Sequence, residues 1–204
     1  MEPKPIRVLI FDLWETIGSK GVGISKTLME HFGIEKTPDF LTKYENSIQL
    51  KNWPTLGEMG VSFLNAFDIP VTENNVNFVV TTLSSAVPAL YDGMQELLKD
   101  LRVSYKLGLL SNTTNFESLS IIKKLGLEDI FDAMVFSWQI NSLKPAKKNF
   151  DAITEKLEVT SEESVFIDDS EKNTTTARSF GFKTIQYKNI EQLKNDLVKM
   201  GISL

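Results

Sequence analysis

The chain has 204 residues, of which 42% are hydrophobic and 24% charged; this is enough for one full hydrophobic core and a smaller second unit but excludes three domains. The formal net charge is -5, and the 22 lysines and arginines form no basic block, so we expect no nucleic-acid partner. No apolar stretch reaches the ~20 residues that a membrane-spanning helix requires, and residues 1–5 lack the apolar segment of a signal peptide, so we expect a cytoplasmic protein with no membrane partner.

The first predicted strand covers residues 7–12, and its apolar run ends in Asp12. The long region after it contains no convincing strand, but it has four segments with helical signals: spacing at residues 25–33, and helix starts at Thr37-Pro38, Thr55 and Thr72. Glu58, three residues after Thr55, completes a capping box. The apolar faces of these helices can be buried only against one another, which predicts a helical cap domain over residues 18–89, inserted after the first strand.

From residue 93 onward, helical segments alternate with short β-branched runs. The predicted helices are residues 93–101, 116–126, 147–157 and 174–181. The predicted strands are residues 106–112, 133–137, 164–168 and 183–187. Repetition of strand, helix and strand predicts an α/β fold: a three-layer Rossmann-like core with a parallel sheet, formed by residues 1–17 and 90–204.

The residue types limit the chemistry. The chain has no cysteine and a single histidine, His31, which excludes disulfides, thiolate metal sites, cysteine nucleophiles and His-rich metal clusters. Catalysis by a Ser-His pair would need His31 itself. Any reaction must otherwise depend on Asp, Glu, Lys, Ser, Thr and Asn side chains.

Polar residues stand at the ends of the predicted strands. Asp12 ends the first strand, Ser111-Asn112 ends the second, Asp168-Asp169 ends the strand of residues 164–168, and Lys144 begins the helix leading to that strand. Ligands gather at the carboxyl ends of parallel strands, so we expect these side chains to share one crevice. Carboxylates packed this closely raise one another's pKa values unless a cation lies among them. A Mg²⁺ ion that binds oxygen ligands and a substrate phosphate would suit such a site for phosphoryl transfer.

In this order, the residues resemble the four motifs of the haloacid dehalogenase-like hydrolases. The segment Asp12-Leu13-Trp14-Glu15-Thr16 resembles motif one, in which phosphatases of that family carry D-x-D-x-T. The segment "LLSN" with Ser111 resembles motif two, and Lys144-Pro145 resembles motif three. The segment "FIDDSEKN" with Asp169 and Asn173 resembles motif four. The helical insertion after motif one is similar to the cap of that family. The resemblance covers nearly the whole chain.

The resemblance implies a covalent phosphatase mechanism. Asp12 would attack the phosphorus atom and form an aspartyl-phosphate, the route open to a carboxylate nucleophile. The Asp12 carboxylate, the backbone carbonyl of Trp14 and the Asp169 carboxylate would hold Mg²⁺. Lys144 would take part in catalysis by offsetting the charge of Asp12 and of the phosphate.

The resemblance also implies a phosphate site and a supporting shell. Ser111 and Asn112, together with Lys144, would bind the phosphoryl oxygens. The residues that would support the ligands without contacting the reacting atoms are Thr16, Asp168 and Asn173. The expected substrate is a small phosphorylated molecule, and we expect a monomer or a homodimer.

Trp14 departs from the phosphatase pattern. In those relatives, this position is the aspartate that protonates the leaving group and then activates water, and an indole N–H does neither at neutral pH. General acid–base catalysis contributes roughly 10²- to 10⁴-fold to a rate, so its loss would lower the activity or narrow it to substrates with good leaving groups. Glu15 is a poor substitute, because adjacent residues near a strand end point in different directions.

Three functions therefore compete. A Mg²⁺-dependent phosphatase of low or narrow activity is the expected one. A dehalogenase-type C–X hydrolase needs no proton for its leaving group, but Asp168-Asp169 would repel a carboxylate substrate, and residues 8–101 contain no arginine to hold it. The third is a catalytically weak protein that keeps the fold and binds phosphate or a partner.

Overall fold

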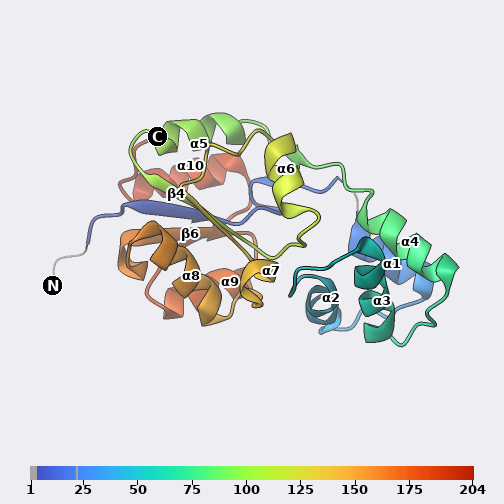
Figure 1. Ribbon diagram of the computed structural model, residues 1–204. Helices are drawn as coiled ribbons and strands as arrows, with labels where there is room; N and C mark the ends of the chain where they lie inside the picture. Colours follow the sequence, from blue (N-terminus) through green and yellow to red (C-terminus); the bar gives the residue numbers. More distant parts are fainter. Residues whose placement is uncertain (1–3, 22) are drawn as a thin grey trace.

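The computed structural model describes residues 4–21 and 23–204. Residues 1–3, which belong to the segment without a signal-peptide pattern, and Val22, which falls in the predicted cap domain, lie outside the described residues. Figure 1 shows two parts of the molecule: a sheet covered by helices, and a separate group of four helices beside it.

The sheet consists of five parallel strands in the order β5-β4-β1-β6-β7. Their bounds are β1 Val8–Phe11, β4 Lys106–Ser111, β5 Ala133–Phe136, β6 Ser164–Asp168 and β7 Lys183–Gln186. Each lies within one residue of the predicted bounds. β1 is central: Leu9 is aligned with Leu107 of β4 and with Val165 of β6. Both faces of β1 are buried, as expected for a parallel strand between two helical layers.

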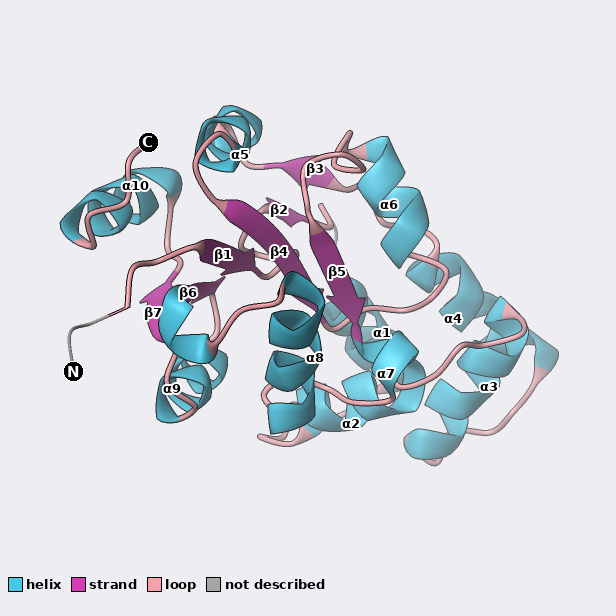
Figure 2. Cartoon of the chain, turned by 60° about the vertical axis from the view of Figure 1, so that its left-hand side comes forward, coloured by secondary structure: helices cyan, strands magenta, loops and turns pink. Residues whose placement is uncertain are grey.

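Helices cover both faces of the sheet (Figure 2). Their bounds are α5 Met94–Arg102, α6 Ser118–Lys124, α7 Ser137–Ile140, α8 Lys147–Leu157, α9 Glu171–Ser179 and α10 Ile190–Lys199, with a short 3₁₀ helix at Ser161–Glu163. Leu9 and Phe11 pack with α5, α6 and α10, whereas Val8 and Ile10 pack with α8 and α9. This alternation is the period of two of a strand, and it confirms the three-layer α/β fold.

Three details of this part differ from the prediction. α9 begins at Glu171, three residues before its predicted start, because the Ser170 side chain accepts the N–H of Asn173 and caps the helix. The first turn of α9 is polar, so the spacing of apolar residues does not indicate where the helix begins. α7 and α10 were not predicted. For α10, the Asn189 side chain accepts the N–H of Gln192, a start signal that the sequence does carry.

The four remaining helices form what we name the helical lobe, residues 24–83. Its elements are α1 Ile24–Phe32, α2 Phe40–Ile48, α3 Leu56–Ala66 and α4 Glu73–Leu83. They bury their own hydrophobic cluster, which includes Phe40, Phe63 and Val79. Thr55 and Thr72 cap α3 and α4 as predicted. α2 does not begin at Thr37-Pro38: a turn closes there, with the N–H of Phe40 donating to the Thr37 carbonyl, and the helix begins after it.

Two short strands connect the lobe to the sheet, in a region where no strand was predicted. β2 (Gly18–Ser19) and β3 (Ala89–Leu90) pair antiparallel where the chain leaves the sheet and where it returns. The two backbones approach so closely that a Cβ atom on Gly18 would lie 2.3 Å from the Ala89 carbonyl oxygen, so only glycine fits there. Two-residue strands are too short to show a period of two, which is why the sequence did not reveal them. The division into domains at residues 17/18 and 89/90 stays a prediction.

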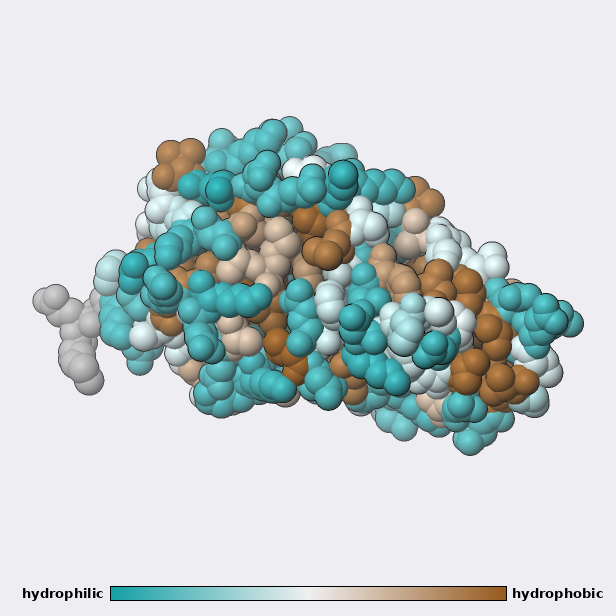
Figure 3. All heavy atoms as spheres, in the orientation of Figure 1, coloured by the Kyte–Doolittle hydropathy of each residue, from teal (hydrophilic) through white to brown (hydrophobic). Residues whose placement is uncertain are grey.

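The surface differs between the two parts. Figure 3 shows hydrophilic and hydrophobic side chains interspersed over the sheet part, whereas hydrophobic ones gather over the end of the helical lobe formed by α3 and α4. In the described part of the chain, no helix has both the length and the apolar character that crossing a bilayer requires.

Candidate active site

The strand-end residues converge at one edge of the sheet. Asp12 directly follows β1, Ser111 is the last residue of β4, and Asp168 is the last residue of β6, and these three strands are neighbours. All three side chains are buried, with Asp168 fully inaccessible. The expectation that distant polar residues share one crevice agrees with this geometry.

Lys144 lies between two of these carboxylates. Its Nζ atom is 2.5 Å from Asp12 Oδ1 and 2.7 Å from Asp168 Oδ2. Burial alone would lower the pKa of Lys144, but the two carboxylates outweigh it and raise the pKa above its ordinary value. Lys144 does not begin a helix as predicted. It lies in the loop before α8, which starts at Lys147. A loop position lets the side chain reach inward to the strand ends.

Asp168 is held from several sides. Besides Lys144, it accepts the backbone N–H of Ser170 at 2.9 Å and the side-chain amide of Asn173 at 3.0 and 3.1 Å. A buried carboxylate with this many donors is fixed in position. Asp168 and Asn173, both predicted as supporting residues, therefore act on Lys144: they hold its ammonium group against Asp12.

A third carboxylate completes the cluster. One oxygen each of Asp12, Asp168 and Asp169 lies within 4.8 Å of the others, and Asp169 is the exposed member. Burial raises the pKa of Asp12, and Lys144 opposes that rise. Burial and then the charge of Asp168 raise the pKa of Asp169. One ammonium does not balance three carboxylates, so these oxygens could hold a divalent cation.

The motif-one loop is tied to Asp169 and directs Glu15 away from Asp12. The hydroxyl of buried Thr16 accepts the backbone N–H of Asp169 at 3.0 Å. Glu15 has a left-handed backbone (φ 58°), which non-glycine residues adopt infrequently. Its carboxylate accepts a hydrogen bond from the Tyr91 hydroxyl at 2.7 Å. This contact occupies the carboxylate that could have replaced the missing motif-one aspartate.

Trp14 forms part of the pocket wall. Its indole Nε1 is buried and has no hydrogen-bond partner among residues 4–21 and 23–204. The Lys20 ammonium lies 4.7 Å from the centre of the indole ring and 3.0 Å from Glu117 Oε2. The position therefore offers an apolar ring and an N–H donor, with no group that exchanges a proton at neutral pH.

The predicted phosphate residues lie beside the cluster. In the described part of the chain, the buried hydroxyl of Ser111 has no hydrogen-bond partner. Leaving a buried polar group unpaired costs about 1–3 kcal/mol, so such a hydroxyl is suited to a ligand oxygen. Asn112 accepts the backbone N–H of Lys144 at 2.9 Å through its Oδ1 atom. This contact links the end of β4 to the lysine loop.

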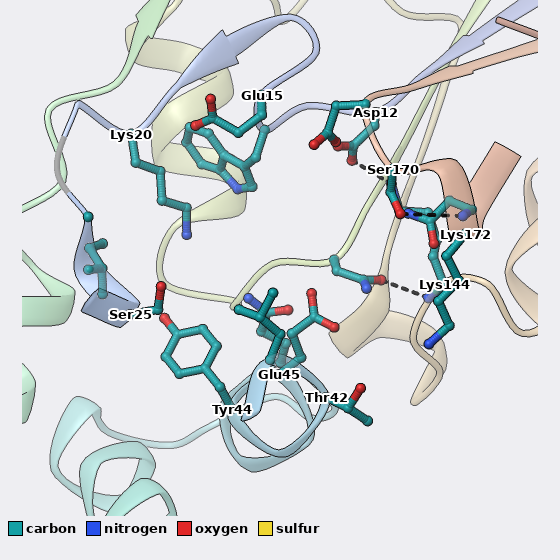
Figure 4. Close-up of a pocket in the computed structure, with 18 of the residues that line it drawn as sticks. Asp12, Glu15, Lys20, Ser25, Thr42, Tyr44, Glu45, Lys144, Ser170 and Lys172 are labelled. Atoms are coloured by element: carbon teal, nitrogen blue, oxygen red, sulfur yellow. Dashed lines mark hydrogen bonds and ion pairs between the residues drawn. The ribbon is translucent and has the colours of Figure 1, made fainter. Parts of the chain in front are cut away.

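Both parts of the molecule line the pocket at this edge. Its volume is about 540 Å³, and its lining includes Asp12, Trp14 and Lys144 together with the α2 residues Tyr44 and Glu45. Figure 4 shows Tyr44 and Glu45 across the pocket from Asp12. Sequence analysis missed Glu45. Helical spacing shows which face of α2 is apolar, but it does not show that the adjacent polar position faces the sheet part across a pocket.

Comparisons with known proteins agree with this architecture. The family model of the haloacid dehalogenase-like hydrolases matches residues 9–187. A structure of a family enzyme from Bacteroides thetaiotaomicron is 25% identical, with a TM-score of 0.68, and the match covers 91% of this chain and 95% of that one. A predicted family hydrolase from Porphyromonas gingivalis is 21% identical, with a TM-score of 0.70, and the match covers 98% and 100%. The Bacteroides enzyme has also been solved as a magnesium complex.

Two curated relatives are similar over shorter stretches. A phosphorylated carbohydrates phosphatase from Thermotoga maritima is 34% identical over 90 residues, which cover 44% of this chain and 41% of the relative. A D-ribitol-5-phosphate phosphatase from Bacteroides thetaiotaomicron is 33% identical over 105 residues, which cover 48% and 50%. The matched stretches thus span half or less of each relative. With its family model matched over most of its length and its strand-end residues gathered at one sheet edge, this chain belongs to the haloacid dehalogenase-like hydrolases.

Proposed function

We propose that this protein is a Mg²⁺-dependent phosphatase that hydrolyses a small sugar or polyol phosphate through an aspartyl-phosphate on Asp12. The observation that carries the proposal is the buried contact of Asp12 with Lys144 at the strand ends, next to the strand that ends in Ser111, whose hydroxyl has no partner among the described residues. Both curated relatives described above are phosphatases of phosphorylated carbohydrates or polyols. The mixed polar and apolar walls of the pocket are compatible with a substrate of that kind.

The residues at the site fit a magnesium ion. Among the described residues, one ammonium contacts this cluster of three carboxylates and leaves it with net negative charge, so a divalent cation would relieve their repulsion. Asp12, Asp169 and the Trp14 carbonyl would hold the ion. When bound, it would offset the charge of the phosphoryl oxygens.

The chain's own groups account for the remaining steps. Asp12 attacks the phosphorus atom, the bond from phosphorus to the substrate oxygen breaks, and water later releases phosphate from the aspartyl-phosphate. Lys144, held by Asp168, keeps its charge beside the phosphoryl group throughout. Ser111 and Asn112 donate hydrogen bonds to the phosphoryl oxygens. We propose that the helical lobe serves as the cap that excludes water during transfer.

The pocket favours this function over the two alternatives. A dehalogenase would bring a carboxylate substrate against Asp168 and Asp169, and the described residues that line the pocket include no arginine to hold it. A protein that only binds phosphate would not need a buried lysine fixed against a carboxylate nucleophile. The absence of an acid at Trp14 lowers the expected turnover and does not remove the nucleophile.

Phosphate release tests the proposal. The protein is incubated with 4-nitrophenyl phosphate and with a panel of sugar and polyol phosphates, with Mg²⁺ or with a chelator. We expect Mg²⁺-dependent release that Asp12→Asn abolishes and that Asp151→Asn, an exposed carboxylate on α8, leaves unchanged. Release that ignores Mg²⁺, or that survives Asp12→Asn, would refute the proposal. Halide release from a 2-haloacid without metal would instead support the dehalogenase.

A further inference from the structure

Glu45 stands out among the carboxylates that line the pocket. The described lining residues include four of them: Asp12, Glu15, Glu45 and Asp169. The proposed function assigns Asp12 as the nucleophile and Asp169 to the metal, and Tyr91 engages Glu15. Glu45 is the member left without a role. It comes from α2, and Figure 4 shows its carboxylate pointing into the pocket across from Asp12.

A chain of contacts places Glu45 near the reacting atoms. Asn112 uses its Oδ1 atom to accept the backbone N–H of Lys144, which leaves its amide N–H₂ group to face the Glu45 carboxylate. The Lys144 side chain then contacts Asp12. Two residues of the proposed phosphate site, Asn112 and Lys144, therefore connect Glu45 to the nucleophile, and Glu45 and Asp12 line the same pocket.

The direction of the reaction points to the same wall. In phosphoryl transfer, the attacking and leaving oxygens lie roughly in line on opposite sides of phosphorus. With Asp12 as the attacking group, the leaving oxygen faces away from β1, toward the wall that α2 forms. The water that later attacks the aspartyl-phosphate approaches from that side as well. A single carboxyl group there could serve both steps.

We propose that Glu45 is the general acid and base of the reaction, supplied by the helical lobe in place of the missing motif-one aspartate; this rests on the proposed phosphatase function. In the first step, Asp12 bonds to phosphorus, the P–O bond to the substrate breaks, and the leaving oxygen takes the Glu45 proton to become an alcohol. In the second, a water oxygen bonds to phosphorus, Glu45 takes a water proton, and the P–O bond to Asp12 breaks. Glu45 is then protonated again, and phosphate departs.

The surroundings of Glu45 support this cycle. The side chain is partly buried, and burial raises its pKa, so that more of it is protonated near neutral pH than of an exposed glutamate. The groups on other elements that act on this pKa are the Asn112 amide, the Lys144 and Lys172 ammonium groups, and the Asp168 carboxylate. The amide and the two cations oppose the rise, and Asp168 adds to it. A carboxyl group balanced in this way can give up a proton and recover it.

Leaving-group dependence tests the proposal. Glu45→Gln keeps the shape and removes the proton. With a polyol phosphate, whose alkoxide must be protonated, we expect kcat to fall roughly 10²- to 10⁴-fold. With 4-nitrophenyl phosphate, whose leaving group needs no proton, we expect a rapid burst of one nitrophenolate per enzyme, followed by slow turnover because the aspartyl-phosphate now lacks its base. Glu45→Asp should recover part of the polyol phosphate turnover.

Controls separate the possible failures. Glu30→Gln makes the same change at an exposed position of α1 and should leave both substrates unaffected. Absence of the nitrophenolate burst, with the first turnover slowed equally on the two substrates, or a rise in KM with kcat unchanged, would show that Glu45 only binds substrate and would overturn the proposal. If Glu45→Gln does not fold, Glu45→Asp is compared with Glu45→Ala. Polyol phosphate turnover that is no higher in Glu45→Asp than in Glu45→Ala would then overturn the proposal. If the wild-type protein releases no phosphate at all, the proposed function itself fails.

Discussion

The two walls of the pocket are built in different ways. On the sheet side, Asp12, Ser111 and Asp168 stand at the ends of neighbouring parallel strands, so the pairing of the strands alone brings them together. On the lobe side, the position of Glu45 depends on how α2 is held against the sheet part. The comparison teaches that short sequence motifs encode the nucleophile and its charge partners, whereas groups that complete the site can come from packing between two parts of the chain.

Hydrogen bonds between segments far apart in the chain help to hold the helical lobe against the sheet part. The Ser137 hydroxyl donates to the carbonyl of Gln49, the residue that follows α2, at 2.7 Å. Asn115 forms a pair of hydrogen bonds with the backbone of Trp53, at 3.0 and 3.1 Å. Both partners from the sheet part lie more than 60 residues from Gln49 and Trp53 along the chain. Local sequence patterns cannot anticipate contacts over such separations.

The largest effect is expected on the sheet wall. Lys144→Met leaves Asp12 and Asp168 buried without their cation, which should lower stability by about 3–5 kcal/mol in urea unfolding. Turnover should fall by about 10²- to 10³-fold on aryl and alkyl phosphates alike, because the lysine acts on the phosphoryl group that both share. Lys147→Met, an exposed lysine on α8, is the matched control. Near wild-type turnover in Lys144→Met would contradict the view that the sheet side of the pocket supplies the charge partner of the nucleophile.

A smaller effect is expected where the two walls meet. Trp14→Asp puts a carboxyl group back at the motif-one position, and it should raise turnover of a polyol phosphate by about tenfold or more. In that background, Glu45→Gln should cost less than it does with Trp14 present, because the two carboxyl groups would do the same work. Steady-state kinetics of the four proteins measures this coupling. If Glu45→Gln lowers turnover by the same factor with Trp14 and with Trp14→Asp, the two positions act independently.

The smallest effect is expected far from both walls. Before β6, Glu163 accepts hydrogen bonds from the backbone and hydroxyl of Thr160 and from Arg7, and these lower its pKa from 4.5 to about 2. Because the folded-state pKa is depressed, the stabilisation is present above pH 4.5 and is lost as the pH falls toward 2. Acid unfolding of Glu163→Gln should therefore be less steep in that window, with turnover at neutral pH unchanged. An acid unfolding curve that is the same in Glu163→Gln as in the wild-type protein would contradict this stabilising role of Glu163.

The sequence predicted the sheet and one wall of the pocket, for identifiable reasons. Buried parallel strands are short β-branched runs, so their bounds and the polar residues at their ends could be read directly. Lys144 was expected at a helix start, because spacing does not separate a loop from the first turn of a helix. Glu45 could not be predicted, because α2 contains one carboxylate whose partner surface is formed by residues distant in the chain.

The pairing of Gly18 with Leu90 has a consequence for how the chain folds. β1 and β4 are adjacent in the sheet although the whole helical lobe separates them along the chain, and closing so long a loop is entropically unfavourable. A lobe that collapses on its own hydrophobic cluster and joins its two ends shortens that loop to residues 12–17 and 91–105, the length of an ordinary crossover through one helix, α5. The sheet can then pair β1 with β4 almost as if they were consecutive, and the insertion slows assembly of the nucleophile's strand far less than its length would imply.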